Sequence, residues 1–109
     1  MVEEFHSELK ELKKRVVKMG NLAQDMLQKS VKALKEQDTD LARDVLNCKQ
    51  QIAVMDEEIE QDALKLITLY ATMAKDMRQI ASVLKIITYI ASIGRYGKDI
   101  ANITLEISG

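Results

Sequence analysis

Apolar residues recur along the first third of the chain with alternating steps of four and three. These steps place them on one face of a helix, in the pattern of helices that pack at shallow angles in a bundle or coiled coil. The face comprises Phe5, Leu9, Leu12, Val16, Met19, Ala23, Met26, Ser30 and Ala33. Four further apolar residues, Leu22, Leu27, Val31 and Leu34, widen this face and favour a bundle. The pattern predicts a first helix of about 30 residues, roughly 45–50 Å long.

A local stop and restart follows at Asp38-Thr39-Asp40. Asp and Thr are favoured N-cap residues, because their side-chain oxygens accept hydrogen bonds from the first turn of a helix. The apolar stripe resumes directly afterwards, and its members are Leu41, Val45, Cys48, Ile52, Met55, Ile59, Ala63, Leu66 and Tyr70. This second stripe predicts one long amphipathic helix that ends near Tyr70.

The stretch from Asp76 to Ile103 is apolar nearly all round, since Lys85 is its only charged residue between Ile80 and Ile93. We expect such a helix to be buried on several sides. Its boundary with the second helix is less clear, because the heptad spacing continues through Tyr70, Ala74, Met77, Ala81, Leu84, Thr88 and Ala91. Periodicity therefore also permits one helix from Thr39 to the end, as in a long coiled-coil rod.

Two features favour a turn near Ala71–Ala74 over the rod. The one-sided stripe changes there to an all-round apolar helix, and Thr72 followed by Asp76 is a possible helix start. The resulting prediction is an all-α fold, an antiparallel three-helix bundle of long helices that occupies residues 1–109 as one domain. The all-round apolar third helix further predicts a homodimer.

Composition narrows the function classes. The 109 residues contain no proline, four glycines, one cysteine and 30% charged residues, with a formal net charge of −1. The charge gives no electrostatic reason to expect nucleic acid or an anionic membrane surface as a partner. The apolar run carries Lys85 and falls short of a membrane span, and the first residues lack a signal-peptide core. We therefore expect a cytoplasmic protein without direct membrane insertion.

Candidate chemistry is sparse. His6 and Cys48 are the single residues of their types and lie far apart, so we expect an exposed histidine, a packing cysteine and no enzyme. The acidic run Asp56, Glu57, Glu58, Glu60 and Asp62 is the only metal-binding candidate, but a solvated helix face explains it without any metal and is the favoured interpretation. Further along, Arg95 and Lys98 are an alternative anion site, whereas Arg95 and Asp99 are spaced for an ion pair. Gly94 and Gly97 suggest close helix approach.

Two stretches of the third segment carry a family resemblance: Ala74-Lys75-Asp76-Met77-Arg78 after Thr72, and Ile93–Ala101 after Lys85. With these stretches and the helical pattern above, the chain resembles the PhoU family of phosphate-uptake and phosphate-signalling regulators. The resemblance covers essentially the whole chain, which corresponds to one of the two three-helix bundles usual in that family. The turn Ala74-Lys75-Asp76-Met77-Arg78 is similar to the family's Pro-x-Ala-x-Asp-Leu-Arg, with Thr72 in place of its proline. Lys85 and the stretch Ile93–Ala101 fall on the family's Glu-Arg-Ile-Gly-Asp-x-Ala-x-Asn-Ile-Ala segment. The motif positions that this alignment points to, for partner contact or structure, are Asp76, Arg78, Lys85, Gly94, Arg95, Gly97 and Asp99.

One departure from the family pattern changes the expected chemistry. The family's acidic pair, which is associated with multinuclear iron or zinc binding, is replaced here by Ala91 and Arg95. Alanine has no ligand atom and a guanidinium repels a cation, so we expect no metal and no cofactor at these positions.

The resemblance implies a non-catalytic regulator of phosphate transport and phosphate homeostasis that acts by protein–protein interaction. Its implied partners are the ATPase of the phosphate ABC transporter or a sensor kinase. A one-bundle chain either dimerises or is a fragment of a longer protein. Two alternatives stay open at this point: a metal- or anion-binding helical bundle, and a purely structural coiled-coil interaction module.

Overall fold

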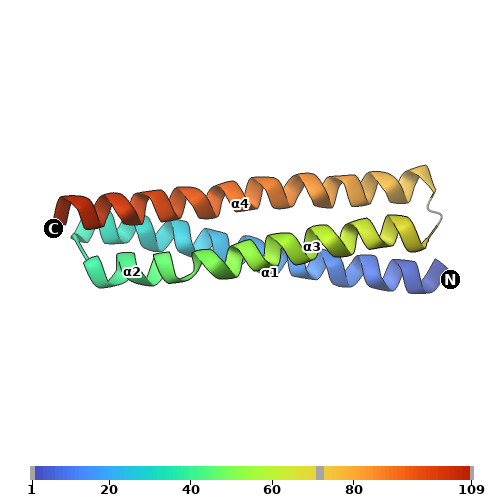
Figure 1. Cartoon of the computed structure of the whole chain (residues 1–109), viewed down its shortest axis with the longest axis horizontal. Coiled ribbons are helices and arrows are strands. Elements are labelled where there is room, and N and C mark those ends of the chain that lie inside the picture. Colours follow the sequence, from blue (N-terminus) through green and yellow to red (C-terminus); the bar gives the residue numbers. More distant parts are fainter. Residues whose placement is uncertain (1, 71–72, 109) are drawn as a thin grey trace.

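The chain folds into long helices that lie side by side in an elongated bundle of 56 × 17 × 16 Å, as the computed structural model in Figure 1 shows. The structure describes residues 2–70 and 73–108. The helices are α1 (Val2–Glu36), α2 (Thr39–Asn47), α3 (Lys49–Leu69) and α4 (Ala74–Ser108). α1 and α4 run in the same direction, and α2 and α3, which connect them in sequence, run antiparallel to both. The described residues contain no strand, and the predicted all-α, antiparallel bundle of three long rods is confirmed.

The turn between α1 and α2 lies where the sequence predicts it. Gln37 adopts the left-handed conformation with a φ of 56°, which reverses the chain directly after α1. The Asp38 amide then donates to the Ala33 carbonyl at 2.9 Å and satisfies one of the last carbonyls of α1. As the N-cap of α2, the Asp38 carboxylate accepts a hydrogen bond from the Leu41 amide at 3.0 Å.

The predicted second helix is interrupted once, which the apolar stripe did not indicate. α2 ends at Asn47, α3 begins at Lys49, and Cys48 lies between them with φ −85° and ψ −12°. The Cys48 amide donates to the Val45 carbonyl, three residues back, at 3.1 Å. This is the tighter turn of a 3₁₀ helix. Cys48 is half-buried against the core, as expected for a packing cysteine.

The chain reverses between Leu69, where α3 ends, and Ala74, where α4 begins. A single rod from Thr39 to the end of the chain is therefore wrong. Ala71 and Thr72 lie outside the described residues, and so does the predicted helix start at Thr72. Just beyond them, the Met73 carbonyl accepts from the amides of Asp76 and Met77 at 2.9 and 3.0 Å, which opens α4.

The core confirms the predicted face of α1 in full, because all nine of its members are buried. On α4 the buried residues form a different stripe from the continued heptad, namely Ile80, Val83, Ile87, Ile90, Gly94, Gly97, Ala101 and Thr104. The continued heptad is wrong as a core stripe, since Ala74, Ala81 and Thr88 are exposed. We expected α4 to be buried on several sides, but one of its apolar sides is open in the single chain, where Tyr89 and Tyr96 are 60% and 58% exposed.

No helix in the two described stretches, 2–70 and 73–108, has the length and hydropathy needed to cross a membrane.

Candidate functional site

The motif positions on α4 do not converge on one site. Asp76 lies in the first turn, where its carboxylate is 3.7 Å from Nε2 of His6, which is itself exposed. Arg78 and Lys85 are exposed along the helix, and Asp99 is exposed near its other end. Because Asp76 and Asp99 are separated by roughly 35 Å of helix, these positions can contact a partner over an extended surface but cannot act on one small molecule.

The two glycines of the motif have a structural role, as their spacing predicts. A Cβ atom placed on Gly94 would lie 3.4 Å from Cγ2 of Ile52 on α3. One placed on Gly97 would lie 3.1 Å from the carbonyl carbon of Met26 and 3.2 Å from the Leu27 amide nitrogen on α1. Gly97 therefore lets α4 approach the backbone of α1 directly, whereas Gly94 meets a side chain.

A surface cavity of about 230 Å³ between α3 and α4 brings together Arg95 and Lys98, the predicted anion-binding pair. Lys49 adds a third cation to the lining, and Asp56 adds one carboxylate. Sequence reasoning missed Lys49, although its spacing of seven residues from Asp56 places both on one face of α3. The cavity can hold an inorganic anion by charge, but the Asp56 carboxylate opposes one.

Arg95 makes a different contact from the predicted one. Its guanidinium donates to Oγ of Ser92 at 2.9 Å, one turn toward the amino end. The Asp99 carboxylate instead lies 3.7 Å from Nζ of its neighbour Lys98. The predicted Arg95–Asp99 ion pair is therefore not among the ion pairs of the described residues.

The pKa of Asp56, on the lining of this cavity, is raised by its surroundings. Partial burial beside the cavity raises its pKa above the usual value, and the negative charge of Glu60, one turn further along α3, raises it further. The three cations of the cavity do not offset these effects. The folded chain thus holds a proton on Asp56 more tightly than the unfolded chain does.

This shift predicts that Asp56→Asn stabilises the protein at neutral pH. An acid whose pKa is raised on folding lowers the free energy of unfolding as the pH rises through its titration range, and the amide removes that cost. We expect a gain of less than about 1 kcal/mol at pH 7, because solvent screens a half-buried carboxylate. The gain should vanish below about pH 3, where the carboxyl is protonated in both states.

Urea unfolding at several pH values measures this difference between wild type and Asp56→Asn. Glu57→Gln is the matched control, because it removes the same charge from the adjacent, exposed position of α3. An equal gain in both variants would show that net charge, and not the burial of Asp56, carries the effect.

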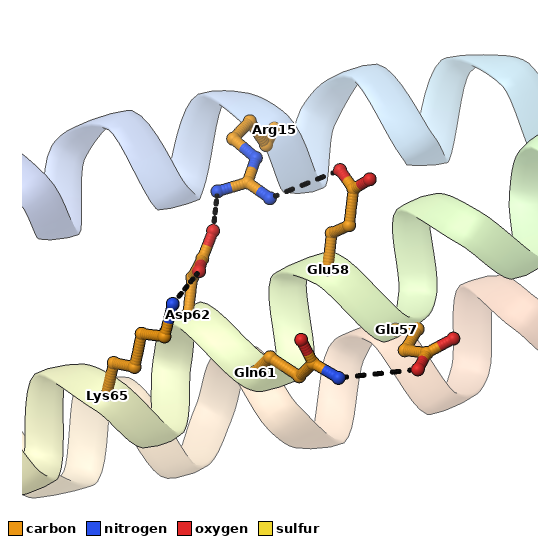
Figure 2. A network of polar contacts seen from close by, with 6 residues as sticks. All are labelled: Arg15, Glu57, Glu58, Gln61, Asp62 and Lys65. Atoms are coloured by element: carbon orange, nitrogen blue, oxygen red, sulfur yellow. Dashed lines mark hydrogen bonds and ion pairs between the residues drawn. The ribbon is translucent and has the colours of Figure 1, made fainter.

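Glu57, Glu58 and Asp62 of the acidic run make polar contacts with Gln61, Arg15 and Lys65, as Figure 2 shows. Glu58 and Asp62 point toward α1, where Arg15 donates to Asp62 at 2.6 Å and lies 4.0 Å from Glu58. Glu57 accepts from the Gln61 amide at 3.3 Å on another side of α3. Within the described residues, no three His, Cys, Asp or Glu side chains are grouped as metal ligands. Glu58 and Asp62 therefore link α3 to α1, whereas Glu57 pairs within α3.

Two relatives that match most of the chain carry the same protein description. A "phosphate-specific transport system accessory protein PhoU homolog" from Aquifex aeolicus (strain VF5) is 33% identical over 94 residues, which are 86% of this chain and 42% of the relative. The homolog from Clostridium acetobutylicum is 30% identical over 106 residues, 96% of this chain and 48% of that protein. The chain thus spans about half the length of the curated relatives that it matches.

The fold comparison agrees. The crystal structure of PhoU from Pseudomonas aeruginosa superposes with a TM-score of 0.93 at 25% identity, and the match covers 95% of this chain and 50% of that one. The PhoU domain description matches residues 16–104, well over half of the sequence. The chain therefore belongs to the PhoU family.

Proposed function

We propose that this protein is a non-catalytic regulator of phosphate transport and phosphate homeostasis that acts in the cytoplasm through protein–protein contacts. The observation that carries the proposal is the match of the PhoU domain to residues 16–104, supported by relatives described as accessory proteins of a phosphate-specific transport system. In this proposal residues 1–109 act as one PhoU-like bundle and associate as a homodimer.

The proposed partners are the ATPase of the phosphate ABC transporter or a sensor kinase that responds to phosphate. Among the motif positions, Arg78, Lys85 and Arg95 are exposed on α4 and are free to reach a partner surface. Asp99 extends this surface toward the end of α4, whereas Asp76 lies on another side of the helix, next to His6 of α1. Gly94 and Gly97 contribute indirectly, because they set the packing of α4 against α3 and α1.

Deletion of the coding region in the source organism tests the regulatory role. We expect altered uptake of radiolabelled phosphate in phosphate-rich medium, and recovery when the 109-residue chain is supplied from a plasmid. Binding of the purified chain to the transporter ATPase and to the cytoplasmic part of the kinase, measured by biolayer interferometry, identifies the partner. Unchanged uptake together with no binding to either protein would contradict the proposal.

An anion-binding role is the second candidate, because Lys49, Arg95 and Lys98 line one cavity. Isothermal titration of the chain with inorganic phosphate and with sulfate tests it. Binding that is lost in Arg95→Ala and kept in Lys32→Ala, an exposed lysine on α1, would support this role. Identical titrations of wild type and Arg95→Ala would remove it.

A further inference from the structure

α4 carries a second apolar stripe that the bundle does not cover. Its members recur with alternating steps of three and four, and each of them except the last stands one position before a residue of the core stripe. We call this set the outer seam; it consists of Ile86, Tyr89, Ile93, Tyr96, Ile100, Ile103 and Ile107. Six of the seven are exposed large apolar side chains, and Ile100 is partly buried. The outer seam thus lies about 100° around α4 from the core.

The spacing of the outer seam is that of a coiled coil. Seven consecutive a and d positions filled by isoleucine and tyrosine form a continuous helix-packing surface over more than three heptads. Solvation alone does not require this regularity, since scattered exposed apolar residues are normal on a surface and ordered ones mark an interaction site. The outer seam is therefore built to receive another helix.

Its area suits a helix pair. The seven side chains together expose on the order of 600 Å², a patch at the upper end for a monomer. Val17 and Val31 of α1 are also exposed, and α1 borders α4 on this side, where Nζ of Lys13 donates to Oε1 of Gln79 at 2.6 Å. With such flanking residues the contact approaches the roughly 800 Å² per partner of a stable interface.

Charges along the edge of the outer seam indicate which helix covers it. The a positions of the outer seam are Ile86, Ile93, Ile100 and Ile107. The residues directly before them change from basic to acidic along α4, in the order Lys85, Ser92, Asp99 and Glu106. Among the described residues, neither Lys85 nor Glu106 takes part in an ion pair within the chain. A second α4 in the opposite direction would bring Lys85 of each copy to Glu106 of the other, at both ends of the contact.

We propose that the outer seam binds the outer seam of a second copy of this chain, antiparallel, around a two-fold axis at the level of Gly94 and Arg95. In this register Ile93 packs against Tyr96 of the second copy, Tyr89 against its Ile100, and Ile86 against its Ile103. A two-fold contact is closed, because both copies use the same surface. The inference deepens the homodimer of the proposed function by naming its surface and direction. Relatives of about twice this length have room in one chain for two such bundles.

Sedimentation equilibrium of the 109-residue chain at micromolar concentration tests the contact. We expect a dimer for the wild type and at least a hundredfold weaker association for Tyr96→Glu, which places a charge beside Ile93 of the second copy. Circular dichroism should show an intact fold, because the side chain is exposed in the single bundle. Leu64→Glu is the matched control: Leu64 is exposed on α3, away from the outer seam, and its replacement should leave the dimer intact.

A charge exchange tests the direction. Lys85→Glu and Glu106→Lys should each weaken self-association about tenfold, because each variant places like charges at both ends of its own dimer. Mixed one to one, the two variants should form a heterodimer of wild-type affinity, since every end then holds one glutamate and one lysine. A parallel pair separates positions 85 and 106 by about 30 Å and gives no such rescue.

A wild-type chain that stays monomeric at tens of micromolar, or a dimer that survives Tyr96→Glu, would overturn the interface. A dimer lost in Tyr96→Glu but not rescued in the mixture would overturn the antiparallel register. These outcomes are separate from failure of the regulatory role, which phosphate uptake and partner binding measure.

Discussion

Leu66→Ala should lower the free energy of unfolding by about 2–4 kcal/mol. The Leu66 side chain lies on the inner face of α3 and is 5% exposed. Its truncation removes three buried carbon atoms and leaves a space that the long, stiff helices cannot close. An open cavity of about 350 Å³ between α1 and α3 lies next to Leu66, so water can enter part of the new space and the loss stays below the upper end of the range for leucine.

Leu64→Ala provides the matched control for this change. Leu64 stands on the same helix two residues earlier, but its side chain is 47% exposed, so we expect a change of less than about 0.5 kcal/mol. Urea unfolding followed by far-ultraviolet circular dichroism measures both variants. All samples need the same protein concentration, because dimerisation adds to apparent stability. Equal losses in the two variants would show that the inner face of α3 is assigned wrongly.

The inward faces of the first two predicted helices could be predicted because their apolar residues recur in steps of three and four without interruption. The stripe from Phe5 to Ala33 is uninterrupted and entirely buried. The Asp38 cap was likewise readable, since a helix start depends on local hydrogen bonds. The stripe from Leu41 to Tyr70 also faces the core, although five of its nine members are buried and four are partly buried. On α2, before the break at Cys48, Ala42 is fully buried although it lies outside this stripe.

The core face of α4 could not be predicted by continuing the same heptad. The reversal between Leu69 and Ala74 restarts the helix, so its phase depends on how α4 rotates against α1 and α3. Two apolar stripes run along α4 one position apart, and their periodicity does not indicate which of them is buried in the core. In the structure the stripe that contains Gly94 and Gly97 faces inward, and at Gly97 it lies directly against the Met26 backbone of α1.

The side-chain pairs of the candidate site depend on more than spacing. Within α4, Ser92 and Asp99 both lie one turn from Arg95, and spacing alone does not decide that Arg95 donates to Ser92. In the same way, Arg15 and Asp62 are 47 positions apart and meet only because α1 and α3 are antiparallel. Spacing along one helix predicts shared faces, whereas pairs between helices require the packed structure.

Gly97→Ala should destabilise the protein by about 1–3 kcal/mol, although alanine is the better helix former. The new methyl group would lie 3.1 Å from the Met26 carbonyl carbon and 3.2 Å from the Leu27 amide nitrogen. Both atoms belong to the backbone of α1, which cannot rotate away as a side chain can. Relief of the clash requires α4 to move from α1, and this motion loosens neighbouring contacts such as those of Ala101 and Thr104, which are fully buried.

Gly20→Ala gives the opposite sign and separates the clash from helix propensity. Gly20 lies inside α1, and a Cβ atom there would meet only Cδ1 of Ile90 at 3.6 Å, an ordinary contact. Without a clash, the propensity gain of up to about 1 kcal/mol should stabilise the protein. Thermal and urea unfolding of the two variants measure the contrast. If Gly97→Ala also stabilised the protein, α1 and α4 would be further apart than these distances show. If both variants behave as expected, the direct contact of Gly97 with the α1 backbone limits this position of the core stripe to a residue without a side chain.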